Sequence, residues 1–134
     1  MIQSQSIVDI LDNSGIKSVK CVGIYKKSPK NAGKVGVIFI GVVKKFKKKN
    51  PNKKKYKRGS LVKCMFICSK KENQFKSSGL FLKHLTKNGA ILVNSQAIHK
   101  EDLKPLGSRY EGFLPLTCFK SPIFKMANFN KYIL

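Results

Sequence analysis

Acidic side chains are scarce in this 134-residue chain: 6 Asp and Glu stand against 28 Lys and Arg, a formal net charge of +22. The chain also has only 2 His and no Trp. Acid–base catalysis needs convergent carboxylates or imidazoles, and this supply is poor. No H-E-x-x-H, G-x-S-x-G, Walker or G-x-G-x-x-G motif occurs. We therefore expect no enzyme activity, catalytic residue, cofactor or small-molecule substrate.

Long apolar runs are also missing. The longest uncharged run in the first half, VGVIFIGVV at residues 35–43, is far shorter than the roughly 18 residues that a membrane helix needs. The opening MIQSQSIVDILDN has no basic region and carries Asp9 and Asp12, which suits neither a secretory signal nor a transit peptide. We expect no membrane partner, and we expect the chain to begin where its folded domain begins.

The four cysteines are Cys21, Cys64, Cys68 and Cys118. They lie in apolar or strand-like surroundings, which favours reduced, buried thiols. A zinc module that combines Cys64 and Cys68 with His84 or His99 is an alternative, but the C-x3-C spacing fits neither a zinc ribbon nor a knuckle. In a strand these two cysteines would share one face inside a packed core. We therefore expect no metal site.

Short apolar or alternating segments, bounded by Gly, Asn and Pro, make up most of the chain and are typical of strands and turns. The expected strands are residues 6–11, 17–25, 35–45, 60–69, 79–85 and 90–93. Five or six short strands indicate a mainly β fold and a small barrel. We expect a single domain over residues 1–134, with the barrel at about 1–114 and a tail at 115–134.

Two turns and one helical element are predicted between and after these strands. Residues 12–15, Asp-Asn-Ser-Gly, combine side-chain acceptors with a glycine and should reverse the chain. Asn88 and Gly89 suggest a second tight reversal between antiparallel strands. In the tail, a helical stripe interrupted by Pro122 predicts one or two short helical turns that cover the barrel.

The segment KKFKKKNPNKKKYKR at residues 44–58 is basic throughout and contains no acid. Its charges lie within a Debye length of about 8 Å, so they repel one another and form an extended basic loop that a polyanion would bind. Phe46 and Tyr56 could stack on bases or anchor the loop to the barrel. Nucleic acid is the expected partner, with anionic membranes or heparin-like polymers as alternatives. Lysine greatly outnumbers arginine, which alone would favour phosphate contacts over base recognition, but AT-rich codon usage explains part of this excess, so only the total charge is taken as functional.

Several segments occur together in a telling order: MIQSQSIVDILDNSGIKSVKC, a Gly-Val-rich strand before the basic loop, SLVKCMFICSKK, NGAILVN and GSRYEGFLP. Together they resemble the universal L-fourteen family of large-subunit ribosomal proteins over nearly the whole chain. The resemblance implies a closed five-stranded β-barrel with a basic loop or β-ribbon and a short C-terminal helical element. It also implies a structural role in the large ribosomal subunit and no enzyme activity.

The resemblance further implies the partners: large-subunit rRNA, small-subunit rRNA across the subunit interface, neighbouring large-subunit proteins and a ribosome silencing factor. From the charge pattern, with Lys70, Lys71 and Arg109 also matched to basic positions of the family, the expected rRNA-binding residues are Lys17, Lys20, Lys26, Lys27, Lys30, Lys34, Lys44, Lys45, Lys47, Lys48, Lys49, Lys53, Lys54, Lys55, Lys57, Arg58, Lys70, Lys71 and Arg109. The implied intersubunit bridge residues are Lys47, Lys48, Lys49, Thr117, Phe119 and Lys120. A free-standing, histone-like packaging protein is the alternative function.

Departures from the family suggest where the protein works. Residues 73–88 carry fewer charges and more Phe and Leu than the family's Arg-rich hairpin, and the basic loop is a few residues longer than expected. Residues with AT-rich codons (Phe, Tyr, Met, Ile, Asn and Lys) are also abundant. This drift predicts an organelle-encoded protein of the mitochondrial ribosome, in the mitochondrial matrix. A plastid-type organelle or a bacterial cytoplasm is the alternative location.

Overall fold

The computed structural model describes residues 1–25, 31–47, 56–70, 73–74, 81–82, 88–94 and 104–110. The elements in these residues are β1 (Ile7–Ile10), β2 (Ile16–Ile24), β3 (Ile38–Phe46), β4 (Leu61–Cys68), β5 (Asn73–Gln74), β6 (Phe81–Leu82) and β7 (Gly89–Leu92). All of them are strands. Within the same residues, no helix is long and apolar enough to cross a membrane.

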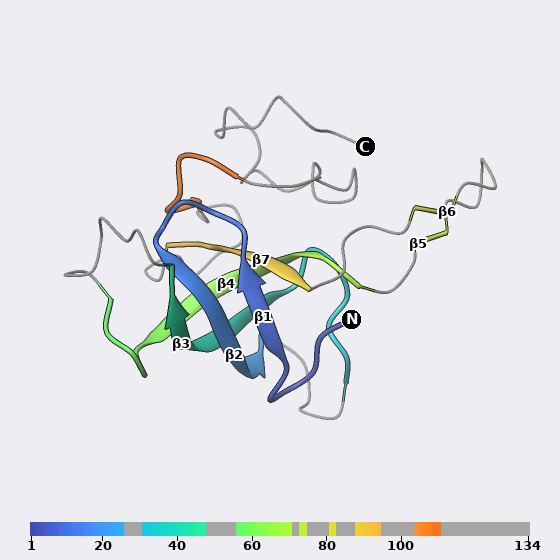
Figure 1. The fold of residues 1–134 in the computed structure, drawn as a ribbon. Coiled ribbons are helices and arrows are strands. Elements are labelled where there is room, and N and C mark those ends of the chain that lie inside the picture. The colour runs from blue at the N-terminus through green and yellow to red at the C-terminus, as the bar shows by residue number, and fades with distance from the viewer. Residues whose placement is uncertain are drawn as a thin grey trace.

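Five of the strands form a closed barrel in the order β1-β2-β3-β4-β7 (Figure 1). Neighbouring strands from β1 to β4 are antiparallel, and β7 runs antiparallel to β4. The barrel closes where β7 lies parallel to β1, with Asp9 opposite Gly89 and Ile10 opposite Ala90. This confirms the expected closed five-stranded barrel. The barrel strands also agree with five of the six predicted segments, with shifts of a few residues at their ends.

The barrel interior is filled by side chains at alternate strand positions. In β4, Val62, Cys64 and Phe66 point into this interior cluster, and Cys64 and Phe66 are fully buried. Met65 and Ile67, on the other face of β4, are also buried, in a second cluster that includes Ile91 of β7. β4 is therefore buried on both of its faces, which explains why its sequence is almost continuously apolar.

The prediction that Cys64 and Cys68 share one face is wrong. The pairing of β4 with β7 shifts between Phe66 and Cys68, so a bulge reverses the alternation at the end of the strand. Cys64 consequently lies in the interior cluster, whereas Cys68 lies in the second cluster and contacts the hydroxyl of Tyr110 at 3.2 Å. Cys21, Cys64 and Cys68 are buried and form no disulfide with one another, as expected, and Cys118 lies outside the described residues.

Asn88 and Gly89 do not form the predicted tight reversal. Gly89 is the first residue of β7 and pairs with Asp9 and Cys68. It is absent from the described glycines that have a positive φ, which are Gly15, Gly36 and Gly59. Asn-Gly is typical of turns, but here Gly89 is part of a strand, because pairing with β1 and β4 on both sides fixes its backbone in an extended conformation.

Two other predicted segments differ from the structure or are only partly visible in it. From the segment predicted as a strand at 79–85, β6 is described, and it pairs with β5 instead of joining the barrel. The predicted basic loop begins inside a strand, because residues 44–46 belong to β3. The tail at 115–134, with its predicted helical element, lies outside the described residues.

Candidate nucleic-acid interface

One end of the barrel is formed by the β1–β2 turn at residues 12–15 and by three other segments that lie near it. These are Lys47, where the chain leaves β3, residues 56–60, where it enters β4, and residues 104–110. We call this region the turn end. Figure 1 shows the β1–β2 connection in blue beside the orange segment 104–110. The turn has the predicted chemistry, since Gly15 has a φ of 91° and the backbone N–H of Ser14 donates to Asp12 Oδ1 at 2.9 Å.

Asp12 is a buried carboxylate with partners on both oxygens. Besides accepting from Ser14, it accepts through Oδ2 from the backbone N–H of Leu92 in β7 at 2.8 Å. Its side chain is only 1% exposed. Hydrogen bonds to a carboxylate are stronger than those between neutral groups, so Asp12 joins the β1–β2 turn to the closing strand of the barrel.

Asn13 connects the turn to the segment that carries Arg109. Its Oδ1 accepts from the backbone N–H groups of Ser108 and Arg109, at 3.0 and 3.3 Å, and its Nδ2 donates to Ser108 Oγ at 2.9 Å. The Asn13 backbone N–H also donates to the Arg109 carbonyl at 3.2 Å. Gly107 allows this close approach, because an added Cβ would lie 2.7 Å from Asp12 Cβ.

Lys47, the residue after β3, is hydrogen-bonded to the same turn. Its backbone N–H donates to the Gly15 carbonyl at 2.9 Å, and its Nζ donates to the Asp12 carbonyl at 2.9 Å. The position where the basic segment leaves β3 is therefore fixed to the β1–β2 turn by main-chain and side-chain hydrogen bonds.

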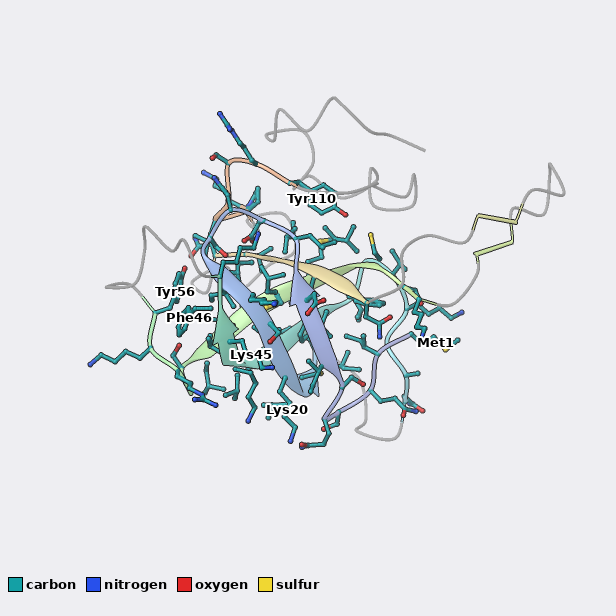
Figure 2. The ribbon with its side chains drawn as sticks, in the orientation of Figure 1. Met1, Lys20, Lys45, Phe46, Tyr56 and Tyr110 are labelled. Atoms are coloured by element: carbon teal, nitrogen blue, oxygen red, sulfur yellow. The ribbon has the colours of Figure 1, made fainter. Side chains whose placement is uncertain are left out.

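The aromatic residues of the basic segment anchor it to the barrel. Phe46 and Tyr56 are partly buried and pack against the interior cluster, and Figure 2 shows both at the same edge of the barrel. Burial, with smaller contributions from the charge of Asp12 and from Cys64, raises the pKa of the Tyr56 hydroxyl. Of the two roles considered for these rings, this geometry supports anchoring.

The return of the connection into β4 is a hydrogen-bonded turn. Gly59 has a φ of 89° and donates from its backbone N–H to the Val43 carbonyl at 3.0 Å. The Ser60 hydroxyl donates to the Lys57 carbonyl at 2.8 Å. Lys57 and Arg58 are exposed on this turn. Their charges therefore face solvent from a backbone that hydrogen bonds hold in place.

Most of the described basic residues lie in the segments of the turn end or at the adjoining ends of β2 and β3. They are Lys17, Lys44, Lys45, Lys47, Lys57, Arg58, Lys104 and Arg109, and all of them are exposed except the half-buried Lys47. Asp12, the described carboxylate at this end, is buried beneath the surface. The exposed positive charges of these described residues attract a polyanion, and counterions are released when one binds.

The other predicted rRNA-binding residues lie elsewhere. Lys20 is half-buried on the barrel wall, opposite Ile7 and Val42, while Lys34 and Lys70 are exposed at the other end of the barrel. The predicted residues outside the described part of the chain are Lys26, Lys27, Lys30, Lys48, Lys49, Lys53, Lys54, Lys55, Lys71, Thr117, Phe119 and Lys120.

Sequence reasoning missed two kinds of residue at this site. Lys104 was not selected, although it lies close before Arg109 in a chain that is basic throughout. Asn13 was assigned only to a turn, because nothing in the sequence indicates a hydrogen-bond partner 95 residues away. In the described ranges, no group of three His, Cys, Asp or Glu side chains could hold a metal ion.

A small closed β-barrel with one cationic end is the architecture of a nucleic-acid-binding barrel protein. Comparison with known families makes this assignment more specific. The chain belongs to the ribosomal protein L14p/L23e family, which it matches over residues 1–133. It is therefore a structural protein of the large ribosomal subunit, and this family is not an enzyme family. The resemblance in the sequence is confirmed.

Two relatives are similar over most of their length. A protein named large ribosomal subunit protein uL14c, from Helicosporidium sp. subsp. Simulium jonesii, is 30% identical over 134 residues, which is 100% of both chains. The protein of the same name from Pelargonium hortorum is 28% identical over 116 residues, covering 87% of this chain and 86% of its own.

These relatives correct the predicted location. Both are chloroplast proteins, which agrees with the plastid alternative and not with the mitochondrial ribosome. The mitochondrial prediction depended on the abundance of residues with AT-rich codons, and this abundance reflects the base composition of the genome that encodes the protein. A bias toward AT-rich codons does not distinguish one organelle from another.

Proposed function

We propose that this protein binds large-subunit rRNA through Lys- and Arg-phosphate contacts made mainly by the turn end of the barrel. The observation that carries this proposal is the concentration of described, exposed basic side chains at that end, above a buried Asp12. Phosphates attract such a surface whatever the base sequence, so these contacts position the protein on folded RNA. Membership of a ribosomal protein family supports rRNA as the polyanion.

The protein works in a plastid ribosome, as its chloroplast relatives suggest. There, residues 44–58 and the start of the tail contribute to bridges with small-subunit rRNA, through Lys47, Lys48, Lys49, Thr117, Phe119 and Lys120. Neighbouring large-subunit proteins, and a silencing factor, bind other parts of its surface. The anchoring of Lys47 to the turn supports the first of these roles, because it fixes the direction in which the basic segment leaves the barrel.

A comparison of the two barrel ends tests the RNA contacts. The variant Lys44→Gln/Arg58→Gln removes two exposed charges from the turn end, and Lys34→Gln/Lys70→Gln removes two from the other end. Affinity for a large-subunit rRNA transcript is measured between 50 and 300 mM salt. We expect the first variant to reduce the slope of log K against log salt by about 1.5, at roughly 0.7–0.9 per phosphate contact, and the second to change it far less.

Because both variants lose two positive charges, comparing them distinguishes a specific RNA interface from general attraction between the basic protein and RNA. Equal losses in the two variants would contradict the turn end as the interface, since the whole surface would then attract RNA uniformly. A wild-type protein that sediments only outside ribosomal particles would contradict the ribosomal role and favour a packaging protein. Circular dichroism of each variant verifies that the barrel remains folded.

A further inference from the structure

Two basic residues from distant parts of the chain are attached to the same four-residue turn. Lys47 follows β3, and Arg109 lies in the segment after β7. Lys47 is held through the carbonyls of Asp12 and Gly15, whereas Arg109 is held by Asn13. The turn is therefore the structural link between the basic segment and the last described cationic segment.

The side chain of Asn13 makes three of the hydrogen bonds that join the turn to the Arg109 segment, beside the main-chain bond from its own N–H to the Arg109 carbonyl. The Asn13 Oδ1 accepts hydrogen bonds from the backbone N–H groups of Ser108 and Arg109, and its Nδ2 donates to the Ser108 hydroxyl. All three bonds are at exposed positions, and Asn13 is itself exposed. Asn13 thus contributes little to the apolar core, and its hydrogen bonds act on the backbone that carries Arg109.

We propose that Asn13 is a positioning residue for RNA binding: it fixes the backbone of Ser108 and Arg109 so that Arg109 and Lys47 meet the phosphates of one RNA segment together. This inference rests on the proposed function. A side chain held in its binding position loses less conformational freedom when it binds, so its contact adds more to the affinity. Without the Asn13 side chain, Arg109 keeps its charge and the main-chain bond from residue 13 to its carbonyl, but the N–H groups of Ser108 and Arg109 lose their acceptor.

The test is a double-mutant cycle on a large-subunit rRNA transcript. We expect Asn13→Ala and Arg109→Ala each to weaken binding about fivefold and each to reduce the salt slope by about one phosphate contact. The double variant should be no more than about twofold weaker than Arg109→Ala, because both changes remove the same contact. A purely structural role for Asn13 would leave the salt slope unchanged.

Asn88→Ala is the matched control at the opposite end. The Asn88 Oδ1 accepts from the backbone N–H of Lys70 at 2.9 Å, so it is also an asparagine that holds the backbone of an exposed basic residue. We expect this variant to bind RNA within about twofold of the wild type. Equal losses in Asn13→Ala and Asn88→Ala would overturn the special role of the turn.

Gly107→Ala keeps the inference testable if Asn13→Ala loses its fold. An added Cβ at Gly107 must displace the segment from Asp12, yet it removes no charge or hydrogen-bonding side chain. We expect the same loss of salt slope as in Arg109→Ala. Wild-type affinity in Gly107→Ala, or additive losses in the Asn13 and Arg109 cycle, would overturn the positioning role while leaving the proposed RNA binding intact. Salt-independent RNA binding by the wild type would instead overturn the proposed function itself.

Discussion

The interior of the barrel and its turn end are stabilised in different ways. The interior is filled by apolar side chains such as Phe39 and Phe66, which are fully buried and make no directional bonds through their rings. The turn end is joined by hydrogen bonds from Asp12 and Asn13 to backbone groups of distant segments. Burial of any apolar group of suitable size stabilises the fold, whereas each hydrogen bond needs a donor and an acceptor at particular positions.

This difference separates stability from function in the molecule. Apolar packing holds the barrel closed, and the turn end uses that fixed frame to arrange charged residues at its surface. Substitutions in the interior should therefore reduce the free energy of unfolding, whereas those at exposed positions of the turn end should mainly affect RNA binding. Four predictions examine this contrast.

The largest effect is expected from Phe66→Ala, which removes a fully buried ring from the interior. The lost burial and the remaining cavity should reduce the free energy of unfolding by about 4 kcal/mol. Leu61→Ala in the same strand is the control, because Leu61 is 69% exposed and its truncation should cost less than about 0.5 kcal/mol. Urea unfolding monitored by circular dichroism measures both values. Similar costs in the two variants would contradict a packed interior.

A smaller but substantial effect is expected from Asp12→Ala at the turn end. The substitution leaves the buried N–H groups of Ser14 and Leu92 without their acceptors, which should cost about 3 kcal/mol in unfolding free energy. Asp12→Asn keeps one acceptor oxygen and should cost about half as much. Urea unfolding of the two variants provides the comparison. Equal stability of Asp12→Ala and the wild type would show that packing alone holds this end.

The alternation of apolar residues predicted the barrel strands well, because burial imposes a period of two on each strand. It failed in detail for Cys64 and Cys68, which were expected on one face but lie in different clusters, because a bulge reverses the pattern at Cys68. A bulge depends on pairing with another strand, and the sequence of β4 alone contains no sign of it. The Asn88–Gly89 prediction failed for the same reason, since strand pairing overrides a local turn preference.

The candidate site was predictable only in its charge. The basic segment indicated a polyanion partner, and the structure adds that Lys47 and Arg109 are attached to one turn. Asn13 could be recognised as a turn residue from its neighbours. Its hydrogen bonds to Ser108 could not be foreseen, because they depend on the tertiary fold and join residues 95 positions apart.

An alkaline pH should weaken the interior selectively. Burial raises the pKa of the Cys64 thiol, and likewise that of Cys21, so the folded state keeps these protons when the unfolded chain releases them. Ionisation of these thiols therefore costs no stability below the unfolded pKa of about 8.5. Above that pH the free energy of unfolding falls, by about 1.4 kcal/mol at pH 9.5 for Cys64. Urea unfolding at pH 7.5 and 9.5 should show this loss, and Cys64→Ala should reduce the pH dependence. An identical pH dependence in that variant would contradict the assignment.

The smallest effect is expected from Ser14→Ala, within the turn itself. The Ser14 hydroxyl oxygen is buried, and it has no hydrogen-bond partner among the described residues. Removing a polar group that lacks a partner relieves its desolvation cost, so we expect the unfolding free energy to stay the same or rise by up to about 1 kcal/mol. Ser60→Ala is the matched control, because its hydroxyl donates to the Lys57 carbonyl and its loss should cost about 0.5–1 kcal/mol. A cost for Ser14→Ala as large as that for Ser60→Ala in urea unfolding would show that the Ser14 hydroxyl is bonded in solution. The opposite signs expected here would show that the turn end is stabilised by particular hydrogen bonds, and not by polarity as such.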